Sequence, residues 1–284
     1  MGVLRAFVAL LGIALVAGLS EPPPKVVARG GLNVLPNPLV LKVVGRSQLE
    51  FVADLFWVRM ANMAGTANTR DEYTALLPIA NLIADLAPRF KYPYYVGGVL
   101  APMRRGRTKE YDNAVEAVAL MQRGVTAVPS YTRLHVQKAY SELEMLHQPV
   151  VAARTLQIAA RLPDAPDYVG KLATRMLAQA GQFDDARAFA LEMATSADDP
   201  QVRADFELRL KQIDLERVLT GVDEAARRYE EEQGHPTTSV DELVAKGYLP
   251  EVPSDPFGGV IELTVTGARS SVESSRLRVH VAPE

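Results

Sequence analysis

The residues best suited to acid–base or metal chemistry are four histidines, and their spacing does not build a site. His135, His147, His235 and His280 are scattered along the chain, and no two stand four residues apart with a carboxylate between them. A catalytic zinc site typically uses such a pair, because helical spacing aims both rings at one ion. We therefore predict no metal site and interpret each histidine as structural or exposed.

Other catalytic patterns are missing from the sequence as well. The pairs Gly30-Gly31 and Gly97-Gly98 lack the lysine and hydroxyl residue of a phosphate-binding loop, and no serine has glycine two residues away on both sides. Asp54, Trp57 and Arg59 fit a core tryptophan flanked by helix-surface charges better than a catalytic group. We predict a protein that is not an enzyme, has no catalytic residues and needs no cofactor.

One basic cluster offers a binding chemistry. It contains Arg104, Arg105, Arg107 and Lys109, and we expect it on a loop between paired helices. Such a loop could meet an anionic lipid head group, a polyanionic glycan or an acidic partner. The alternative is an ordinary solvated loop.

Composition excludes several classes of function. The chain has 284 residues, 48% of them hydrophobic, which allows two domains and a sizeable core. A formal net charge of -3 supplies no excess of cations to neutralise phosphates, so we predict no nucleic-acid partner. The absence of cysteine excludes disulfides and thiolate metal sites.

The N-terminal residues indicate export. Arg5 precedes an uncharged apolar run from Ala6 to Leu19, which ends at Glu21 and three prolines. This pattern is typical of a signal peptide cleaved after Ser20 or of a retained signal anchor. A buried core helix is a third alternative. In both export readings the body lies outside the cytoplasm, either periplasmic or anchored in the inner membrane through residues 2–19. We interpret residues 1–20 as signal or anchor and the Pro- and Gly-rich residues 21–38 as a linker.

From residue 39 to residue 219 the pattern is helical. Apolar residues between Leu49 and Met63 recur at i+3 and i+4 spacing, which predicts an amphipathic helix. The next helix, over residues 71–86, contains Pro78, which predicts a kink or marks the true first turn. The fold class we expect is all-α.

The helices repeat at an offset of 34 residues. Pro129 and Pro163 are separated by that distance, and each closes an apolar helix. The same offset pairs Ala139 with Ala173, Leu143 with Leu177, Gln148 with Gln182, Ala152 with Ala186 and Ala160 with Ala194. Small residues are needed where neighbouring helices approach closely.

The stretch from Ala180 to Ala190 resembles the turn and second helix of a tetratricopeptide repeat. Leu177, Gly181, Phe183 and Ala186 occupy signature positions of that family, whereas Gly170 and Thr174 depart from it, so the repeats are degenerate. The resemblance implies a solenoid of helical hairpins, which we place at residues 47–88, 92–129, 130–163 and 166–199. The concave groove of such a solenoid holds another protein. The candidate groove residues are Tyr95, Tyr131, Tyr140 and Tyr168.

A second resemblance concerns the front of the helical domain. Leu35-Pro36, the stretch from Phe51 to Arg59, Tyr73 and the stretch from Asp85 to Phe90 are similar to exported, tetratricopeptide-containing proteins of delta-proteobacterial envelopes. That group has no assigned activity. The resemblance implies an envelope setting and no mechanism.

After Asp199-Pro200 the composition changes. We expect a charged capping helix over residues 201–219, then a small α+β module over residues 220–284 that begins with a helix at 221–232. Ser239 to Glu242 forms a capping box, and Gly247 suits a left-handed helix end. Residues 260–265 and 276–281 alternate as the strands of a hairpin, with its turn at 270–275.

The segment from Ala225 to Gly259 resembles the globular part of type II secretion pseudopilins. Its matching residues include Tyr229, Pro236-Thr237-Thr238, Gly247 to Pro250 and Asp255 to Gly258. In those proteins the segment joins a helix to a small sheet. The pseudopilin methylation segment is missing here, so polymerisation is not implied. A generic helix–turn–strand module is the alternative.

Two functions follow from these patterns. The preferred one is a non-enzymatic scaffold of the bacterial cell envelope that binds a partner protein through the helical-repeat groove. The alternative is an accessory subunit of an envelope secretion or pilus-like machine, recruited through the C-terminal module.

Overall fold

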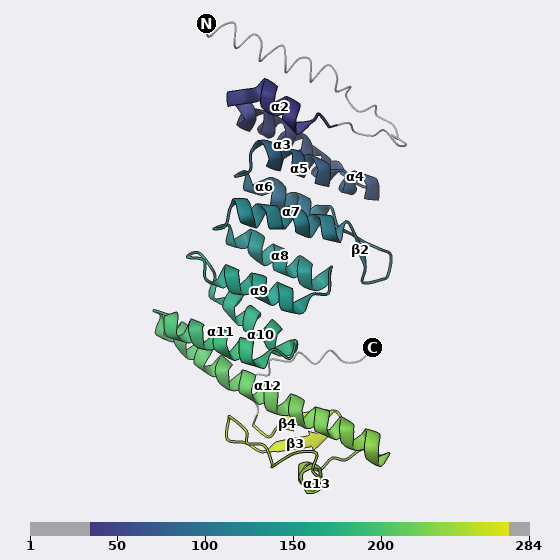
Figure 1. Ribbon diagram of the computed structural model, residues 1–284, viewed down its shortest axis with the longest axis vertical. Helices are drawn as coiled ribbons and strands as arrows, with labels where there is room; N and C mark the ends of the chain where they lie inside the picture. Colours follow the sequence, from purple (N-terminus) through teal and green to yellow (C-terminus); the bar gives the residue numbers. More distant parts are fainter. Residues whose placement is uncertain (1–34, 273–284) are drawn as a thin grey trace. The chain divides into compact units, whose positions relative to one another are not determined.

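The computed structural model describes residues 35–272 of the chain. Contacts divide the protein into two compact units, residues 1–141 (unit 1) and residues 142–284 (unit 2). The described residues are mostly helical, with two small two-stranded sheets (Figure 1). The predicted helical character is confirmed. The predicted signal or anchor over residues 1–20 lies outside the described residues.

Unit 1 consists of successive packed helices. Helix α3 packs on α5, α5 on α6 and α6 on α7, while α2 contacts α3 and α5 (Figure 1). One cluster of buried side chains fills the space between them, with Met60, Ile83 and Tyr94 among its fully buried members. The elements are α2 (Pro38–Gly45), a 3-10 turn (Arg46–Gln48), α3 (Leu49–Thr66), α4 (Arg70–Thr74), α5 (Leu76–Leu86), α6 (Lys91–Leu100), β1 (Met103–Arg104), β2 (Tyr111–Asp112), α7 (Ala114–Ala127) and α8 (Thr132–Glu144), whose last residues belong to unit 2.

Local side chains set the helix starts of unit 1. The Asn37 side chain accepts a hydrogen bond from the Leu39 amide and caps α2. At α4 the Thr69 hydroxyl and the Glu72 carboxylate satisfy each other's backbone amides in a capping box. Pro78 lies in the first turn of α5, where its missing amide proton costs no helical bond. The sequence predicted that Pro78 either kinks a helix or marks its first turn, and the structure shows the first turn.

Helical glycines let α6, α7 and α8 approach closely. A Cβ added to Gly97 would lie 2.8 Å from the Leu120 side chain, and one added to Gly124 would lie 2.6 Å from both Leu134 and Tyr94. Such distances are too short for a real Cβ, so a larger residue would push the helices apart. The glycine pair that begins at Gly97 therefore serves helix packing.

Unit 2 continues with paired helices and ends in a small module. Helix α10 packs on α9 and α11, and both α10 and α11 pack on α12. The elements are α9 (Pro149–Ala160), α10 (Asp167–Gln179), α11 (Phe183–Ser196), α12 (Pro200–Gln233), α13 (Val240–Ala245), β3 (Ile261–Thr264) and β4 (Gly267–Ser270).

The turn between α10 and α11 is closed by a left-handed glycine, as the sequence predicts. Gly181 has φ 73°, and its amide donates to the Ala178 carbonyl at 3.0 Å. The Gln182 amide donates to the Leu177 carbonyl at 2.9 Å. These paired bonds form a Schellman cap, which needs a positive φ at the glycine position.

A positive φ also occurs 34 residues earlier in unit 2. His147 precedes α9 and has φ 54°, a conformation that favours glycine. The following residues, Gln148 and Gln182, are the N-cap residues of α9 and α11. The hydrogen bonds of the two turns differ, because the Gln148 amide donates to the Glu142 carbonyl at 2.9 Å. The 34-residue offset therefore recurs in the positive φ and in the N-cap position.

The alanines predicted to lie at helix contacts are buried, with one exception. Ala160 is only partly buried, and its neighbour Ala159 is fully buried instead. Seven residues make about two helical turns, so Ala159 shares a face with Ala152 and Ala160 is rotated away. The buried members of the predicted set are Ala139, Ala152, Ala173, Ala186 and Ala194.

Helix α12 corrects one expectation. The two helices predicted over residues 201–219 and 221–232 form one helix, Pro200–Gln233, with Gly221 in its interior. Glycine weakens a helix interior by about 1 kcal/mol but does not end it. Buried side chains on both sides of the glycine, such as Ile213 and Val222, hold the helix through this point. The predicted domain boundary between residues 219 and 220 thus lies within α12.

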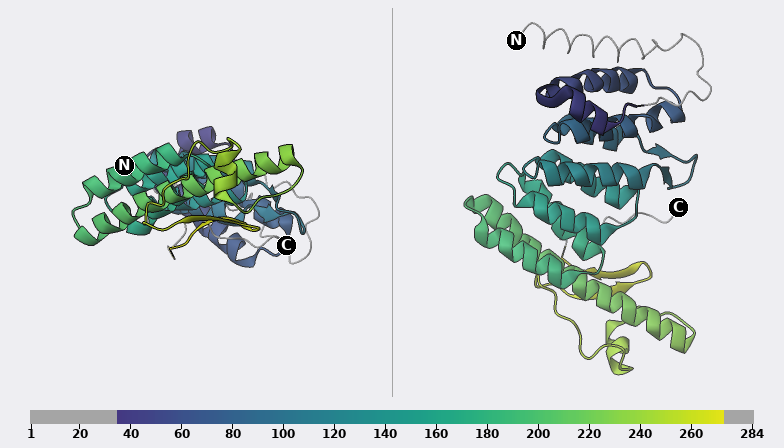
Figure 2. Two further views of the ribbon diagram at one scale, coloured as in Figure 1. Left: turned by 90° about the horizontal axis from the view of Figure 1, so that it is seen from below. Right: turned by 45° about the horizontal axis from the view of Figure 1, so that its top comes forward.

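The C-terminal module packs on the second half of α12. Figure 2 shows β3 and β4 alongside this helix, and α13 contacts both α12 and β3. Gly247 ends α13 with φ 80°, and the Tyr248 amide donates to the Leu243 carbonyl at 2.8 Å, as predicted for a left-handed helix end. Ser239 caps α13, but the Glu242 carboxylate accepts bonds from Tyr229 and Thr237 rather than completing a capping box.

The hairpin of this module differs from the predicted one. Strand β3 pairs antiparallel with β4 across the two-residue turn at 265–266, whereas the predicted second strand, residues 276–281, lies outside the described residues. The Thr264 hydroxyl donates to the Gly267 carbonyl at 2.7 Å and closes the turn. Val265-Thr266 lacks the Asn-Gly or Asp-Gly signal of short hairpins, which is why the pattern did not predict this turn.

Within residues 35–272, no helix has both the length and the apolar character needed to cross a bilayer.

Candidate functional site

Aromatic rings from two helices gather on one surface of unit 1. Trp57 lies on α3, Phe90 is the N-cap residue of α6, and Tyr92 lies in the first turn of α6. The Trp57 and Phe90 ring centres are 5.5 Å apart in an edge-to-face arrangement, and the Trp57 and Tyr92 rings stack at 6.2 Å. Aromatic pairs in these geometries attract each other beyond the area that they bury.

Two cations extend this ring cluster to the start of α8. The Lys91 ammonium lies 4.9 Å from the ring centre of Tyr131 and 5.6 Å from that of Tyr92. The Arg133 guanidinium lies 4.5 Å from the Tyr95 ring centre and donates a 3.1 Å hydrogen bond to the Tyr95 hydroxyl. Cation–π contacts of this kind hold both partners in fixed orientations. The residues Trp57, Phe90, Lys91, Tyr92, Tyr95, Tyr131 and Arg133 are called the aromatic–cation surface below.

The helical period of α6 separates its surface rings from its core ring. Tyr92 and Tyr95 stand at i and i+3 and share one face, whereas Tyr94 faces the core and is 1% exposed. The Tyr94 hydroxyl donates to the Pro88 carbonyl at 3.0 Å, so the buried phenol is satisfied. Tyr94 thereby fixes the rotation of α6 and, with it, the direction of Tyr92 and Tyr95.

The electrostatics of the surface favour an anionic or aromatic ligand. Burial raises the pKa of Tyr131, and the nearby Arg133 partly opposes that effect. The hydrogen bond to Tyr95 raises the pKa of Arg133 further, so Arg133 stays charged. Within residues 35–272, neither Lys91 nor Arg133 pairs with a carboxylate. Their charge is available to a ligand.

The predicted tyrosines lie in different places. Tyr95 and Tyr131 both belong to the aromatic–cation surface, joined through Arg133 and Lys91. Tyr140 lies further along α8 and is 45% exposed. Tyr168 lies on α10 of unit 2 and is 53% exposed.

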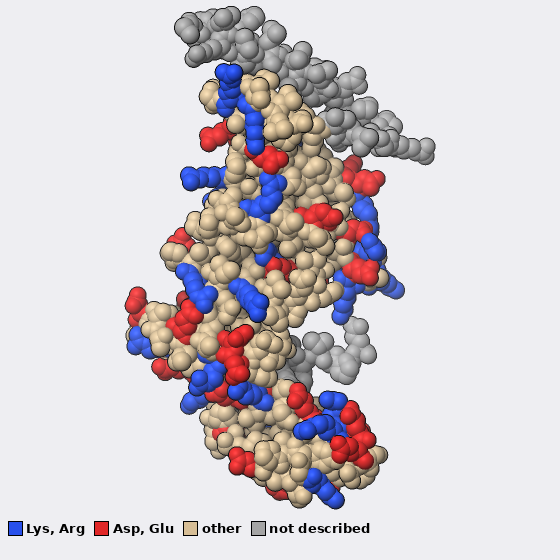
Figure 3. Space-filling model, viewed as in Figure 1, with Lys and Arg blue, Asp and Glu red and all other residues tan. Residues whose placement is uncertain are grey.

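The predicted basic cluster lies on a short β-hairpin between α6 and α7. Residues 103–104 pair with residues 111–112, and Arg70 from α4 forms an ion pair with Asp112 at its base. Arg105 also pairs with Asp112 and with Glu110, so part of the cluster's charge is neutralised by its own hairpin. Figure 3 shows acidic and basic side chains interleaved in this region.

Arg107 and Lys109 lie at the exposed tip of the same hairpin. Arg104 uses its Nε to donate to the Thr108 carbonyl at 2.9 Å, which shapes the loop. An anion would therefore compete with internal carboxylates at the base of the hairpin and meet open cations only at its tip. Binding of an anion by this cluster stays a prediction.

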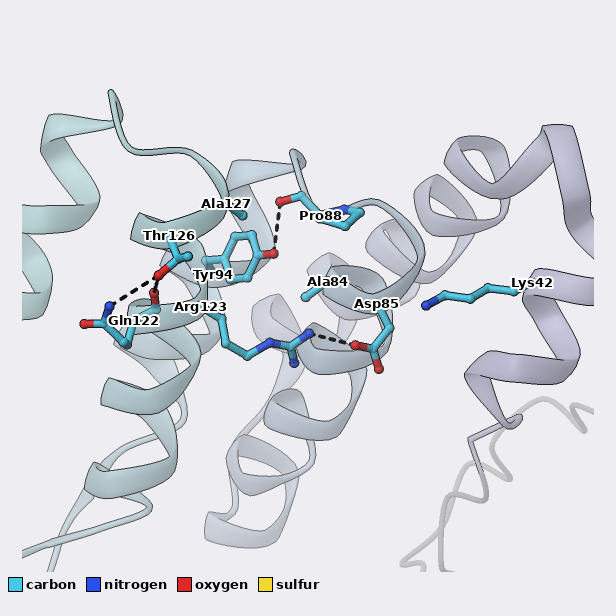
Figure 4. Close-up of a pocket in the computed structure, with 9 residues that line it drawn as sticks. All are labelled: Lys42, Ala84, Asp85, Pro88, Tyr94, Gln122, Arg123, Thr126 and Ala127. Atoms are coloured by element: carbon cyan, nitrogen blue, oxygen red, sulfur yellow. Dashed lines mark hydrogen bonds and ion pairs between the residues drawn. The ribbon is translucent and has the colours of Figure 1, made fainter.

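A shallow hollow of about 450 Å³ lies between α2, α5 and α7 (Figure 4). Arg123 crosses it and bonds to Asp85 at 2.7 Å and to the Asn81 side chain. Lys42 points toward Asp85 from the other side, and Tyr94 closes the floor. Because the polar groups mostly satisfy one another, this hollow ties helices together and has no reactive pair.

The sequence interpretation missed part of the aromatic–cation surface. Trp57 was expected in the core, and it does pack against core residues while remaining partly exposed. Phe90, Lys91, Tyr92 and Arg133 were not singled out. The available signal was the density of rings in the stretch from Phe90 to Tyr95, where four of six residues are aromatic.

No protein-family model, curated protein or solved structure matches this chain.

Proposed function

We propose that this protein is a non-enzymatic scaffold of the bacterial cell envelope, which binds a partner protein through its helical-repeat domain. Five aromatic rings gather on the aromatic–cation surface with two cations that pair with no carboxylate among residues 35–272, and this arrangement carries the proposal. Tryptophan, tyrosine and arginine dominate the energetics of protein interfaces, because they bury large areas at low entropic cost.

The ligand that suits this surface is a protein segment with apolar or aromatic anchors and a carboxylate. Tyr92 is 49% exposed, and Arg133 offers guanidinium donors on the same surface, over the ring of Tyr95. An anchor that packs against the rings would lie within reach of both cations. Charge complementarity then selects acidic segments over basic ones.

The 34-residue recurrence supports a tetratricopeptide-like architecture. His147 and Gly181 both have positive φ, and Gln148 and Gln182 are the N-cap residues of α9 and α11, two helices that are separated by α10. Ion pairs also join helices at about this spacing within unit 2, as between Arg161 and Glu192 at 2.7 Å. Hairpins of this kind are stable only when they stack, which creates extended surfaces for partners.

The envelope setting rests on the sequence of the first twenty residues. An apolar run with a single preceding arginine is typical of export, and a cleaved signal and a retained anchor both place the body outside the cytoplasm. Fractionation of cells that produce the full chain, with protease added to spheroplasts, tests this location.

Site-specific photocrosslinking tests the interaction. A photoreactive phenylalanine analogue replaces Tyr92 in the full chain, and a matched chain carries it at Val115, which is 66% exposed on α7. We expect one defined crosslinked partner from position 92 and not from position 115, and Arg133→Glu should abolish it. Equal crosslinking at both positions, or a product insensitive to Arg133→Glu, contradicts the proposal.

A second candidate is an accessory subunit of a secretion or pilus-like machine, attached through the C-terminal module. This module has its own core against α12 and leaves Val252, Val260 and Val265 exposed at 50%, 63% and 92%. Because α12 is continuous, deleting residues 221–284 would cut a helix. Replacing Val252, Val260 and Val265 with aspartate tests the alternative without cutting α12. If the alternative holds, these changes abolish co-assembly while the crosslink from position 92 persists.

A further inference from the structure

The first helices of unit 1 expose an unusual number of large apolar side chains. They are 45% to 69% exposed and are carried by two consecutive helices, α2 and α3. Single exposed apolar residues are common on soluble proteins, whereas several on two helices that contact each other indicate a contact surface. The residues are Leu39, Val40, Val43, Val44, Phe51, Leu55 and Val58.

Helix α2 directs one residue inward and four outward. Leu41 is 7% exposed and packs into the core of unit 1, so the rotation of the helix is fixed. Residues 39, 40, 43 and 44 have the i, i+1, i+4 and i+5 spacing of one helical stripe, and all four are exposed. On α3, Phe51, Leu55 and Val58 follow at i, i+4 and i+7 and form one face. Figure 3 shows uncharged surface at this end of unit 1, with basic and acidic side chains beside it.

The charges beside the α2 part of this face are basic, because Lys42 and Arg46 are exposed and α2 carries no acidic residue. The α3 part lies beside the exposed acidic residues Glu50 and Asp54. Lys42 lies at the edge of the apolar face of α2, beside the hollow of Figure 4, and Arg46 directly follows the helix. An apolar face with basic neighbours is the composition of a segment that lies in the interface of a lipid bilayer.

The position of the face in the chain points to the same occupant. It begins about eighteen residues after the predicted membrane segment ends, and a chain of that length reaches at most about 60 Å even when fully extended. If residues 2–19 enter a bilayer, α2 therefore lies within that reach of its surface. With only eight residues, α2 lies on the bilayer rather than across it.

From these observations we infer that the exposed apolar face of α2 and α3, here the α2–α3 face, rests on a lipid bilayer. It is a second membrane contact beside the predicted N-terminal segment. The contact holds unit 1 against the membrane and leaves its other helices to partners. The inference rests on the envelope setting of the proposed function, because both interpret residues 2–19 as a membrane segment. The residues of the α2–α3 face are separate from those of the aromatic–cation surface, so the two binding sites are tested independently.

The absence of cysteine makes a direct test possible. Val43→Cys in the full chain is labelled with an environment-sensitive fluorophore and reconstituted in vesicles of phosphatidylcholine and phosphatidylglycerol. Val115→Cys, at similar exposure on α7, is the matched control. We expect the label at 43 to shift to the blue and to be quenched severalfold by spin-labelled lipids. The label at 115 should stay unquenched.

A second variant distinguishes lipid contact through the α2–α3 face from tethering by the N-terminal segment. Leu39→Ser, Val40→Ser and Val44→Ser keep the N-terminal segment but remove the apolar face, so quenching at position 43 should fall to the level at 115. A label at Phe51→Cys gives an independent reading from α3. A label at 43 that is unquenched overturns the inference. So does a blue shift without lipid quenching, which would show that protein, either a second copy or the chain's own N-terminus, covers the face.

Discussion

Arg133 contacts Tyr95 in two ways, with its guanidinium 4.5 Å from the ring centre and a 3.1 Å hydrogen bond to the hydroxyl. The two residues come from α8 and α6, which are separate helices of unit 1. The contact therefore orders the aromatic–cation surface across a helix boundary. A surface that is ordered before binding loses less entropy when a partner arrives.

Replacing Arg133 should therefore affect binding more than folding. We expect Arg133→Gln to lower the free energy of unfolding by less than about 1 kcal/mol, because the residue is exposed. The crosslink from position 92 should nevertheless weaken strongly. Urea unfolding and crosslink yield measure the two effects. A large stability loss with unchanged crosslinking would show that Arg133 serves the fold alone.

Gly124 and Gly221 should respond in opposite ways to alanine. At Gly124 the new Cβ would lie 2.6 Å from Leu134 and Tyr94, so we expect a loss of about 1–3 kcal/mol in the free energy of unfolding. At Gly221 nothing lies within 4 Å, and alanine should stabilise α12 by about 0.5–1 kcal/mol. Denaturant unfolding of both variants tests the packing in unit 1 and the continuity of α12. Destabilisation by Gly221→Ala would argue against a continuous helix.

The paired positions 147 and 181 give a test of the 34-residue pattern. Gly181→Ala forces a Cβ into a left-handed conformation and should cost about 1 kcal/mol. His147→Gly relieves the same strain and should stabilise the protein by up to about 1 kcal/mol. Thermal unfolding measures both. If glycine destabilises at position 147, the two turns are not equivalent.

Much of the helical structure follows from the sequence, because its signals are local. Spacing at i+3 and i+4 indicates the helices, and Gly181 and Gly247 end helices in the conformation that only glycine adopts easily. Pro78 marks a first turn for a similar reason. Such features depend on a few neighbouring residues and need no knowledge of the tertiary fold.

The other structural features depend on tertiary contacts, which cannot be read from the sequence. Gly221 stays helical because buried side chains on both sides hold α12. The β3–β4 turn lacks the usual turn residues, so the sequence did not predict the pairing of β3 with residues 267–270. The sequence predicted two members of the aromatic–cation surface, because Tyr95 and Tyr131 were selected as candidate groove residues. Their link to Trp57 runs through Lys91 and Tyr92. Only the fold brings those side chains together.

Stability should decrease in mild acid through His135. The side chain is 5% exposed, and burial lowers its pKa from 6.5, with help from Lys138 and opposed by the hydrogen bond to the Pro129 carbonyl. As pH falls below 6.5 the unfolded chain binds the proton first, so the contribution of His135 is complete above that pH and is lost below it. The carboxylates also make the free energy of unfolding depend on pH, so a variant without His135 is needed to separate the two contributions.

His135→Gln measures the pH dependence of stability that comes from the carboxylates alone. Its amide can still donate to the Pro129 carbonyl, but it does not titrate. Urea unfolding at pH 7.5 and pH 5.5 should show a smaller loss of stability for the variant than for the parent chain. Equal losses would mean that protonation of His135 has no part in the acid response.

The most direct test of the central claim is the affinity of the full chain for the partner captured from position 92. Isothermal titration calorimetry should find that Tyr92→Ala weakens binding by at least about tenfold, as expected for an aromatic anchor, while Val115→Ala leaves it unchanged. Unchanged affinity in both Tyr92→Ala and Arg133→Gln would contradict the assignment of the aromatic–cation surface as the site of partner binding.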